Sequence, residues 1–318
     1  MFHMKFKLHP FGTMTFRCLV HAGAVAAALM VVGNPNLVRA HGFAGDRFFP
    51  ATLLTDDPFV ADEMSLPTFT RPPAEADGSR EFDLDIDIAK RLTPDIAITL
   101  GRGWTALHSP GMPTVTGFGA LNTGVQYQLF VDAPSETIGL VGLNVNWAHT
   151  GRVNALGAPD FTTLSPSFNF GKGFGDLPGS LPYLRPFAIT GSLGLDFPTK
   201  AASAGTPNPD NFNYGFAFEY SLPYLQCCVK DIGLSRPFSQ LIPLVEIAFS
   251  TPIDRITPGV TTTGTVQPGI IWSGQYFQIG AEAILPVTPA TGHGFGGVVQ
   301  FHIYLGDLFP AFGKLIME

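Results

Sequence analysis

Residues 212–222 read FNYGFAFEYSL, and this stretch decides the fold class. Large apolar side chains occupy every second position from Phe212 to Leu222, and small or polar side chains lie between them. A β-strand points successive side chains to opposite faces, so one face here is apolar and aromatic while the other is polar. A tilted strand of about 9–11 residues crosses a bilayer within a closed barrel. The stretch therefore predicts a membrane-spanning strand.

The same period of two recurs along the chain, in about eleven segments in all. Single-chain bacterial barrels have even strand numbers, so we predict twelve strands, with ten as the alternative. The expected fold is all-β, a transmembrane antiparallel up-and-down barrel with an N-terminal extension. Long outer loops are expected at 199–211 and 225–240. The other alternating segments are 82–88, 96–100, 121–129, 138–147, 168–170, 187–197, 245–249, 265–272, 277–285 and 299–305.

Composition favours a membrane barrel over other classes. Charged residues make up 14% of the chain, against roughly 25% in an ordinary soluble domain. After the leader, no apolar run approaches the roughly 20 residues of a membrane helix. A secreted β-sandwich would also show alternating strands, but it needs charge on its outer faces. The net charge of -7, without a basic stripe, argues against a nucleic-acid partner.

The N-terminus has the pattern of a secretory signal peptide. Basic residues such as Lys5 and Arg17 precede and flank an apolar stretch at 18–33, and Val38-Arg39-Ala40 supplies small residues at a cleavage site. We predict cleavage after Ala40 and export to the outer membrane. The expected organisation is a signal peptide at 1–40, an extension and Pro-rich linker at 41–78, and a barrel at 79–318.

The extension differs from the strands in its pattern. We expect it to lie in the periplasm or to fold back into the barrel mouth, with 66–78 as a linker. Pro58 follows Asp56 and Asp57, which is typical of a helix start, with an acidic cap and proline at the first helical position. The alternative is a calcium site that also uses Asp62 and Glu63.

Acidic residues of the strands share the small, polar face. A carboxylate facing lipid is expensive, so these side chains must look inward. An acidic lumen favours cations or neutral solutes over anions. The alternative is a filled interior in which the acids pair with inward Lys or Arg. The candidate lumen-facing acids are Asp83, Asp85, Asp87, Asp196, Glu219, Glu246 and Glu282.

Cysteine and histidine offer few further sites. The mature chain would retain Cys227 and Cys228, which are adjacent and able to form a disulfide in an oxidising compartment. Cleavage after Ala40 would expose His41, whose amino group and imidazole together chelate copper. A hydrolase needs a nucleophile beside an oriented base, and His149 has no serine at a matching position. We therefore predict no enzyme activity and no cofactor.

Three stretches resemble a known group of Gram-negative outer-membrane β-barrels. Residues 267–286 (QPGIIWSGQYFQIGAEAILP) are similar to the last hairpin of outer-membrane proteins of the phenol meta-degradation type, as are 301–310 (FHIYLGDLFP) and 41–63 (HGFAGDRFFPATLLTDDPFVADE). The resemblance implies an outer-membrane barrel that moves hydrophobic or aromatic solutes.

Together these features predict a channel or transporter for small hydrophobic or cationic solutes by passive diffusion. Its expected partners are outer-membrane lipid and small-molecule solutes, and the sequence leaves the oligomeric state open. Two alternatives remain, a structural barrel that transports nothing and an exported copper-binding β protein that uses His41.

Overall fold

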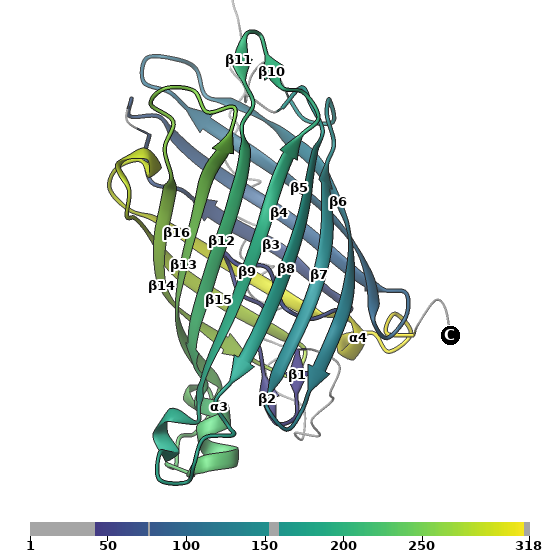
Figure 1. Ribbon diagram of the computed structural model, residues 1–318. Helices are drawn as coiled ribbons and strands as arrows, with labels where there is room; N and C mark the ends of the chain where they lie inside the picture. Colours follow the sequence, from purple (N-terminus) through teal and green to yellow (C-terminus); the bar gives the residue numbers. More distant parts are fainter. Residues whose placement is uncertain (1–41, 76, 153–158, 315–318) are drawn as a thin grey trace, which may run out of the picture. The chain divides into compact units, whose positions relative to one another are not determined.

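Twelve antiparallel strands form a closed barrel in the computed structural model, which describes residues 42–75, 77–152 and 159–314 (Figure 1). Each strand pairs with its neighbour in the chain, and the last strand pairs with the first. The predicted fold class and strand number are confirmed, and a β-sandwich is excluded because the strands form one closed sheet. The strands are β3 (Glu63–Arg71), β4 (Arg80–Arg91), β5 (Ile96–His108), β6 (Val115–Asp132), β7 (Thr137–Asn146), β8 (Thr163–Gly173), β9 (Phe187–Pro198), β12 (Asp210–Tyr220), β13 (Leu241–Asp254), β14 (Thr263–Ser273), β15 (Phe277–Pro286) and β16 (Gly296–Tyr304).

The barrel begins earlier than the predicted residue 79. The first strand, β3, lies within the stretch that we expected to be a linker, and it closes the barrel between β16 and β4. Pro67 lies where the pairing register of β3 shifts against both neighbours, between Ser65 and Thr68. Proline donates no hydrogen bond to a ladder and is tolerated at such irregularities. Because this proline interrupts the ladder, the twelfth strand lacked the regular alternation by which the other strands were predicted.

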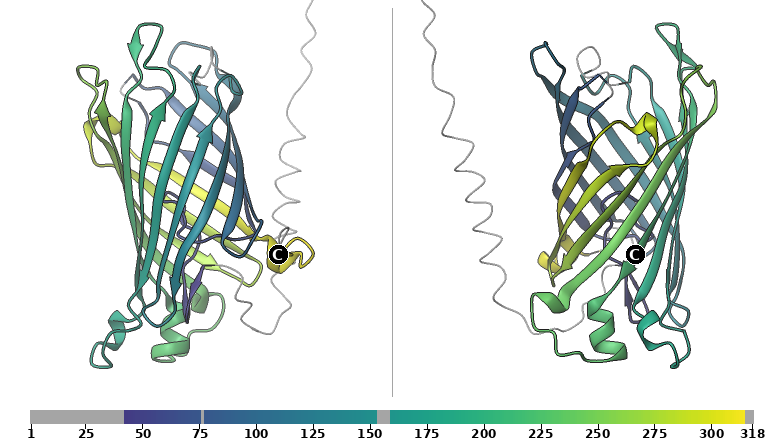
Figure 2. Two further views of the ribbon diagram at one scale, coloured as in Figure 1. Left: turned by 45° about the vertical axis from the view of Figure 1, so that its right-hand side comes forward. Right: turned by 90° about the vertical axis from the view of Figure 1, so that its left-hand side faces the viewer.

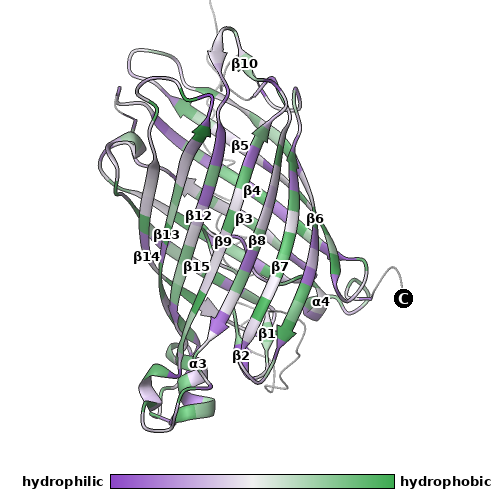
Figure 3. Ribbon diagram, in the orientation of Figure 1, coloured by the Kyte–Doolittle hydropathy of each residue, from purple (hydrophilic) through white to green (hydrophobic). Residues whose placement is uncertain are grey.

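The outer surface of the wall is apolar. Apolar and polar residues alternate along the strands in Figure 3, and the exposed members include aromatic and branched side chains. So much exposed apolar surface is stable only against hydrocarbon, as in an outer-membrane barrel. Exposed apolar side chains of the wall include Phe82, Ile86, Ile98, Leu100, Phe118, Val125, Tyr127, Leu143, Phe187, Phe197, Phe218 and Val245.

The connections differ between the two ends of the barrel (Figure 2). The terminus end, where β3 begins and β16 ends, carries the turns 92–95, 133–136 and 274–276 and the longer connections 174–186 and 221–240. The far end carries the β9–β12 connection with its hairpin. The prediction that 199–211 and 225–240 are both outer loops is wrong, because these connections flank the single strand β12 and lie at opposite ends.

Short elements decorate both ends. None of the helices in the described residues has the length and apolar character needed to cross a bilayer. The small strands are β1 (Phe43–Ala44), β2 (Arg47–Phe48), β10 (Ala202–Ser203) and β11 (Thr206–Pro207). The helical turns are η2 (Pro182–Leu184), α3 (Leu222–Tyr224), η3 (Leu225–Val229), η4 (Phe238–Gln240), η5 (Pro289–Thr291) and α4 (Leu305–Leu308).

The predicted helix start at Asp56 and Asp57 is wrong, because residues 53–61 form bends and extended chain. The Asp57 carboxylate instead accepts a hydrogen bond from the backbone N–H of Thr52 (2.9 Å). Aspartate can satisfy a nearby backbone donor in a turn as well as at a helix cap, so the residue type alone did not distinguish the two.

Candidate functional site: the lumen and its N-terminal plug

Residues 42–62, here called the plug, run into the barrel and bind strands far apart in its wall. The backbone N–H of Val60 donates to Oε1 of Gln128 on β6 (3.0 Å), and the Gln128 amide donates back to the Pro58 carbonyl (3.0 Å). The Gln278 amide on β15 donates to the Ala51 carbonyl. Because four strands separate β6 from β15 around the wall, these bonds suspend the plug across the lumen.

Glu246 of β13 is the main polar anchor of the plug. Its carboxylate accepts hydrogen bonds from the backbone N–H groups of Leu53 (2.7 Å) and Thr55 (2.8 Å) and from the Thr55 hydroxyl (2.9 Å). Glu246 is fully buried. A buried carboxylate is stable only when its oxygens are hydrogen-bonded, so the plug and this glutamate depend on each other.

Arg47 fixes the start of the plug to the turns at the terminus end. Its Nε donates to Glu136 (3.1 Å), its guanidinium donates to the Pro186 carbonyl (3.0 Å), and it lies 3.8 Å over the Tyr224 ring. The Tyr224 hydroxyl donates to the second Glu136 oxygen (2.7 Å). Burial and the Glu136 contact raise the pKa of Tyr224 to about 12, so the phenol remains a donor. These groups are buried, which makes the pair costly to break.

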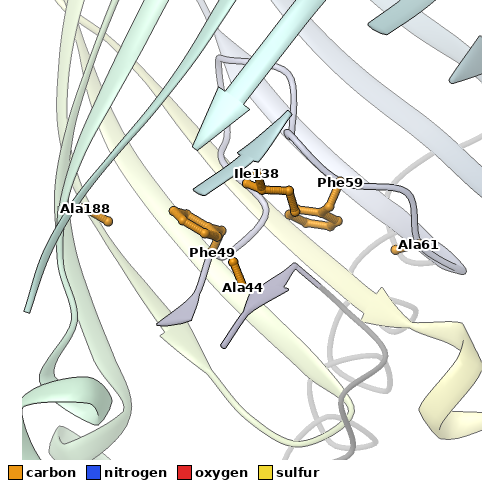
Figure 4. Close-up of a cluster of buried hydrophobic side chains, with 6 residues drawn as sticks. All are labelled: Ala44, Phe49, Phe59, Ala61, Ile138 and Ala188. Atoms are coloured by element: carbon orange, nitrogen blue, oxygen red, sulfur yellow. The ribbon is translucent and has the colours of Figure 1, made fainter. Parts of the chain in front are cut away.

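An apolar cluster supports these polar contacts (Figure 4). Phe49 and Phe59 of the plug are buried against Ala188 and Ile138 of the wall. A Cβ at Gly171 of β8 would lie 2.9 Å from the Phe49 ring, so glycine there makes room for the ring. Burial of a phenylalanine side chain contributes about 1.5–3 kcal/mol, so the two rings add substantially to plug docking.

Ion pairs tie the base of the plug to β4, next to a Glu63–His302 contact that joins β3 to β16. Asp62 accepts from Lys90 (2.7 Å) and from Arg91 (3.0 Å), and Glu63 pairs with His302 (3.1 Å). These partners occupy two of the four acids that we weighed as a calcium site. Within the described residues, no three His, Cys, Asp or Glu side chains are grouped so that they could hold a metal ion.

The three candidate acids of β4 lie along one face of that strand, and their side chains extend over the neighbouring strand β5. Asp85 and Asp87 are opposite Gly103 and Gly101, and a Cβ at either glycine would collide with the carboxylate. Asp83 accepts a hydrogen bond from the Thr105 hydroxyl (2.6 Å). The acids therefore lie along the inner wall, over positions where the neighbouring strand has no side chain.

The other four candidate acids divide between two levels of the lumen. Asp196 lies above the plug and accepts from Ser165 (2.6 Å) and Asn213 (2.8 Å). Glu219, Glu246 and Glu282 lie level with the plug and are buried.

Each glutamate at the plug level has a different contact. Glu219 accepts from the Thr190 hydroxyl (3.3 Å). The Glu282 side chain crosses Gly269 towards Glu246. Of the seven predicted acids, Glu246 alone accepts hydrogen bonds from the plug.

Above the plug the lumen holds a cavity of about 330 Å³. Its lining comes from plug residues 54–56, from strands β9, β12, β13 and β14, and from Thr291. Asp56 lines this cavity and is exposed to the lumen. The enclosing barrel desolvates its carboxyl group, and this desolvation and the nearby charge of Asp196 raise the pKa of Asp56. Burial and the nearby charge of Glu63 raise the pKa of Asp57 well above its usual value. The lumen therefore gathers several carboxyl groups around the plug.

The remaining predicted residues lie away from this site. Cys227 and Cys228 form a disulfide in η3, at the terminus end. His149 is exposed in the turn after β7. The predicted copper ligand His41 and the predicted signal peptide lie outside the described residues, and they stay predictions.

Most of the plug anchors were not among the residues predicted from the sequence. Gln128 and Gln278 occupy inward strand positions, and both are buried while donating to plug carbonyls. A glutamine side chain at an inward strand position indicates that backbone groups of another segment lie close enough to accept its hydrogen bonds. Arg47 and Glu136 gave no such signal, because one lies in the extension and the other in a turn.

The chain is similar in fold to a solved outer-membrane barrel. No protein-family model and no curated protein sequence matches it. The crystal structure of the COG4313 outer membrane channel from Pseudomonas putida F1 aligns with a TM-score of 0.54 and 10% identity, over 86% of this chain and 99% of that one. A NanC porin structure aligns with a TM-score of 0.46 and 5% identity, over 75% of this chain and 98% of that one. The likeness to the first structure supports the outer-membrane barrel fold.

Proposed function

We propose that this protein is an outer-membrane channel through which small cationic solutes diffuse passively, with the plug and the acidic wall as its selectivity elements. The observation that carries the proposal is the arrangement of acids on the inner wall above the plug. Asp83, Asp85 and Asp87 lie on one side and Asp196 on another, with Asp56 of the plug near Asp196. A lumen lined by one sign of charge concentrates the opposite ion.

The finer choice of solute follows from the same geometry. The apolar side chains on the inner wall near the plug, such as Ile242 and Leu244, pack against Leu53 and Phe48 rather than lining free space. The cavity above them is lined by hydroxyl, amide and carboxylate groups together with apolar ones. We therefore favour cations over the hydrophobic or aromatic solutes that the resemblance to the phenol meta-degradation type implies.

Reversal potentials in a potassium chloride gradient test the proposal directly. Purified protein is inserted in planar bilayers as the wild type and as Asp83→Asn/Asp85→Asn/Asp87→Asn. We expect cation preference in the wild type and a several-fold lower ratio of cation to anion permeability in the variant. The matched control Asp95→Asn/Asp132→Asn/Asp231→Asn removes the same charge from exposed turns and strand ends at the terminus end, and it should keep the wild-type ratio.

Two outcomes would contradict the proposal. Anion preference in the wild type would remove the acidic lumen as the selectivity element. Absence of any conductance, both in the wild type and after deletion of the plug, would favour the structural barrel that transports nothing.

A further inference from the structure

The cavity above the plug exists because the inner wall carries small side chains there. Pairing register places Ser192, Gly215, Ala248 and Thr265 in one row across four neighbouring strands. The next row, towards the far end, is Gly194, Asn213, Ser250 and Thr263. Two rows of small residues leave space at the wall that larger side chains would fill, as Glu246 and Gln267 do one row below.

The polar groups of this cavity suit a ligand that brings positive charge and hydrogen-bond donors. No hydrogen bond among the described residues uses the Asp56 carboxylate or the hydroxyls of Ser250 and Thr263, and all three residues line the cavity. The Asn213 amide donates to Asp196, and no hydrogen bond among the described residues uses the carbonyl oxygen of its side chain. The described lining residues include no Lys, Arg or His.

The size and ligand set argue for an organic molecule rather than a metal ion. A volume of about 330 Å³ falls at the lower end of the range of small-molecule sites, roughly 300–1,000 Å³. Within the described chain no cluster of three metal-ligating side chains occurs at this place. Asp56 is accessible from the cavity, and desolvation within the barrel and the charge of Asp196 both raise its pKa, so a bound cation would relieve the electrostatic cost of its charge.

We propose that this cavity is a binding subsite for a small hydroxylated organic cation with a primary ammonium group. The ammonium group binds the Asp56 carboxylate, and the ligand's hydroxyl groups form hydrogen bonds with Ser250, Thr263 and Asn213. The subsite rests on the proposed channel function, since it names the solute class that the channel would select, but the binding itself needs no conductance.

Calorimetric titration with three matched sugars tests the subsite. Glucosamine carries the ammonium group, glucose lacks it, and glucuronate carries the opposite charge. We expect saturable glucosamine binding to the purified full-length protein, weaker glucose binding and no glucuronate binding. Asp56→Asn should weaken glucosamine binding at least tenfold, as expected for loss of one charge-assisted contact. Asp95→Asn, which removes an exposed turn carboxylate, is the control and should leave it unchanged.

A second variant tests whether binding needs the volume of the cavity as well as the charge of Asp56. Ser250→Leu fills the cavity while keeping Asp56, so it should abolish glucosamine binding. The variant should still fold into a barrel, which a difference in gel mobility between boiled and unboiled samples would show. Equal binding of the three sugars, or binding that survives both variants, would overturn the subsite. Cation-selective conductance without glucosamine binding would leave the channel and remove the subsite. Glucosamine binding without conductance would keep the subsite and contradict the channel.

Discussion

The half of the lumen at the terminus end and the half at the far end use the same strand pattern in different ways. In the terminus half, inward Glu246, Gln128 and Gln278 are buried and bonded to the plug. In the far half, inward Asp83 and Asp85 are partly exposed, and their neighbours are small. Both sets alternate with apolar outward residues.

An inward polar residue is either bound into the structure or left facing the lumen, depending on whether a chain segment reaches it. A carboxylate that accepts several backbone hydrogen bonds is committed to the structure. A carboxylate that keeps lumenal exposure can act on ions that pass by. The plug therefore divides one acidic surface into a part bound to the plug and a part exposed to the lumen.

Removal of the plug should have the largest effect on this division. Deletion of Gly42–Ala61, which keeps Asp62 and the barrel strands, opens the terminus half. We expect single-channel conductance to rise severalfold, because the segment across the lumen is gone. The measurement is conductance in planar bilayers at fixed salt.

A deletion at the far end gives the matched control. Removing residues 202–207, the β10–β11 hairpin, shortens a rim connection and should change conductance little. Unchanged conductance after removal of the plug would show that the plug does not limit flow.

Loss of the Arg47 anchor should loosen the plug without opening the barrel wall. Arg47→Met leaves Glu136 buried without its cation, which costs about 3–5 kcal/mol in plug docking. Hydrogen exchange of plug amides, followed by mass spectrometry, should accelerate while β4 and β5 stay protected. The double variant Arg47→Met/Glu136→Gln should recover part of the protection. Equal exchange in the wild type and in Arg47→Met would contradict the assigned anchor.

The smallest expected effect comes from substituting one inward glycine in each half of the lumen. A Cβ at Gly280 would lie 2.5 Å from Leu53 of the plug, so Gly280→Ala should cost about 1–3 kcal/mol through overpacking. At Gly194 in the far half the nearest atom would be 3.5 Å away, so Gly194→Ala should stay within about 0.5 kcal/mol of the wild type. Plug-amide exchange measures both variants. An equal response at the two positions would mean that the plug does not fill the lumen beside Gly280.

Most strands of the barrel could be predicted from the local alternation of apolar and polar residues, and each wrong prediction has a physical reason. Eleven of the twelve strands carry a readable alternation, whereas β3 is interrupted by Pro67 at a register shift. The loop error at 225–240 came from length, since a long connection suggested an outer loop although the order of the strands places it at the terminus end. Asp57 fitted a helix cap as well as the turn that it occupies.

By itself, the sequence determined the class of fold and which strand residues share a face, because side-chain direction in a strand follows from a period of two. Only the tertiary structure decided which inward residues remain exposed to the lumen. That outcome depends on contacts such as Leu53 with Glu246 and Arg47 with Glu136, which join residues far apart in the chain. No local periodicity encodes a contact between an irregular segment and a distant strand, so the division of the lumen emerges only when the barrel closes around the plug.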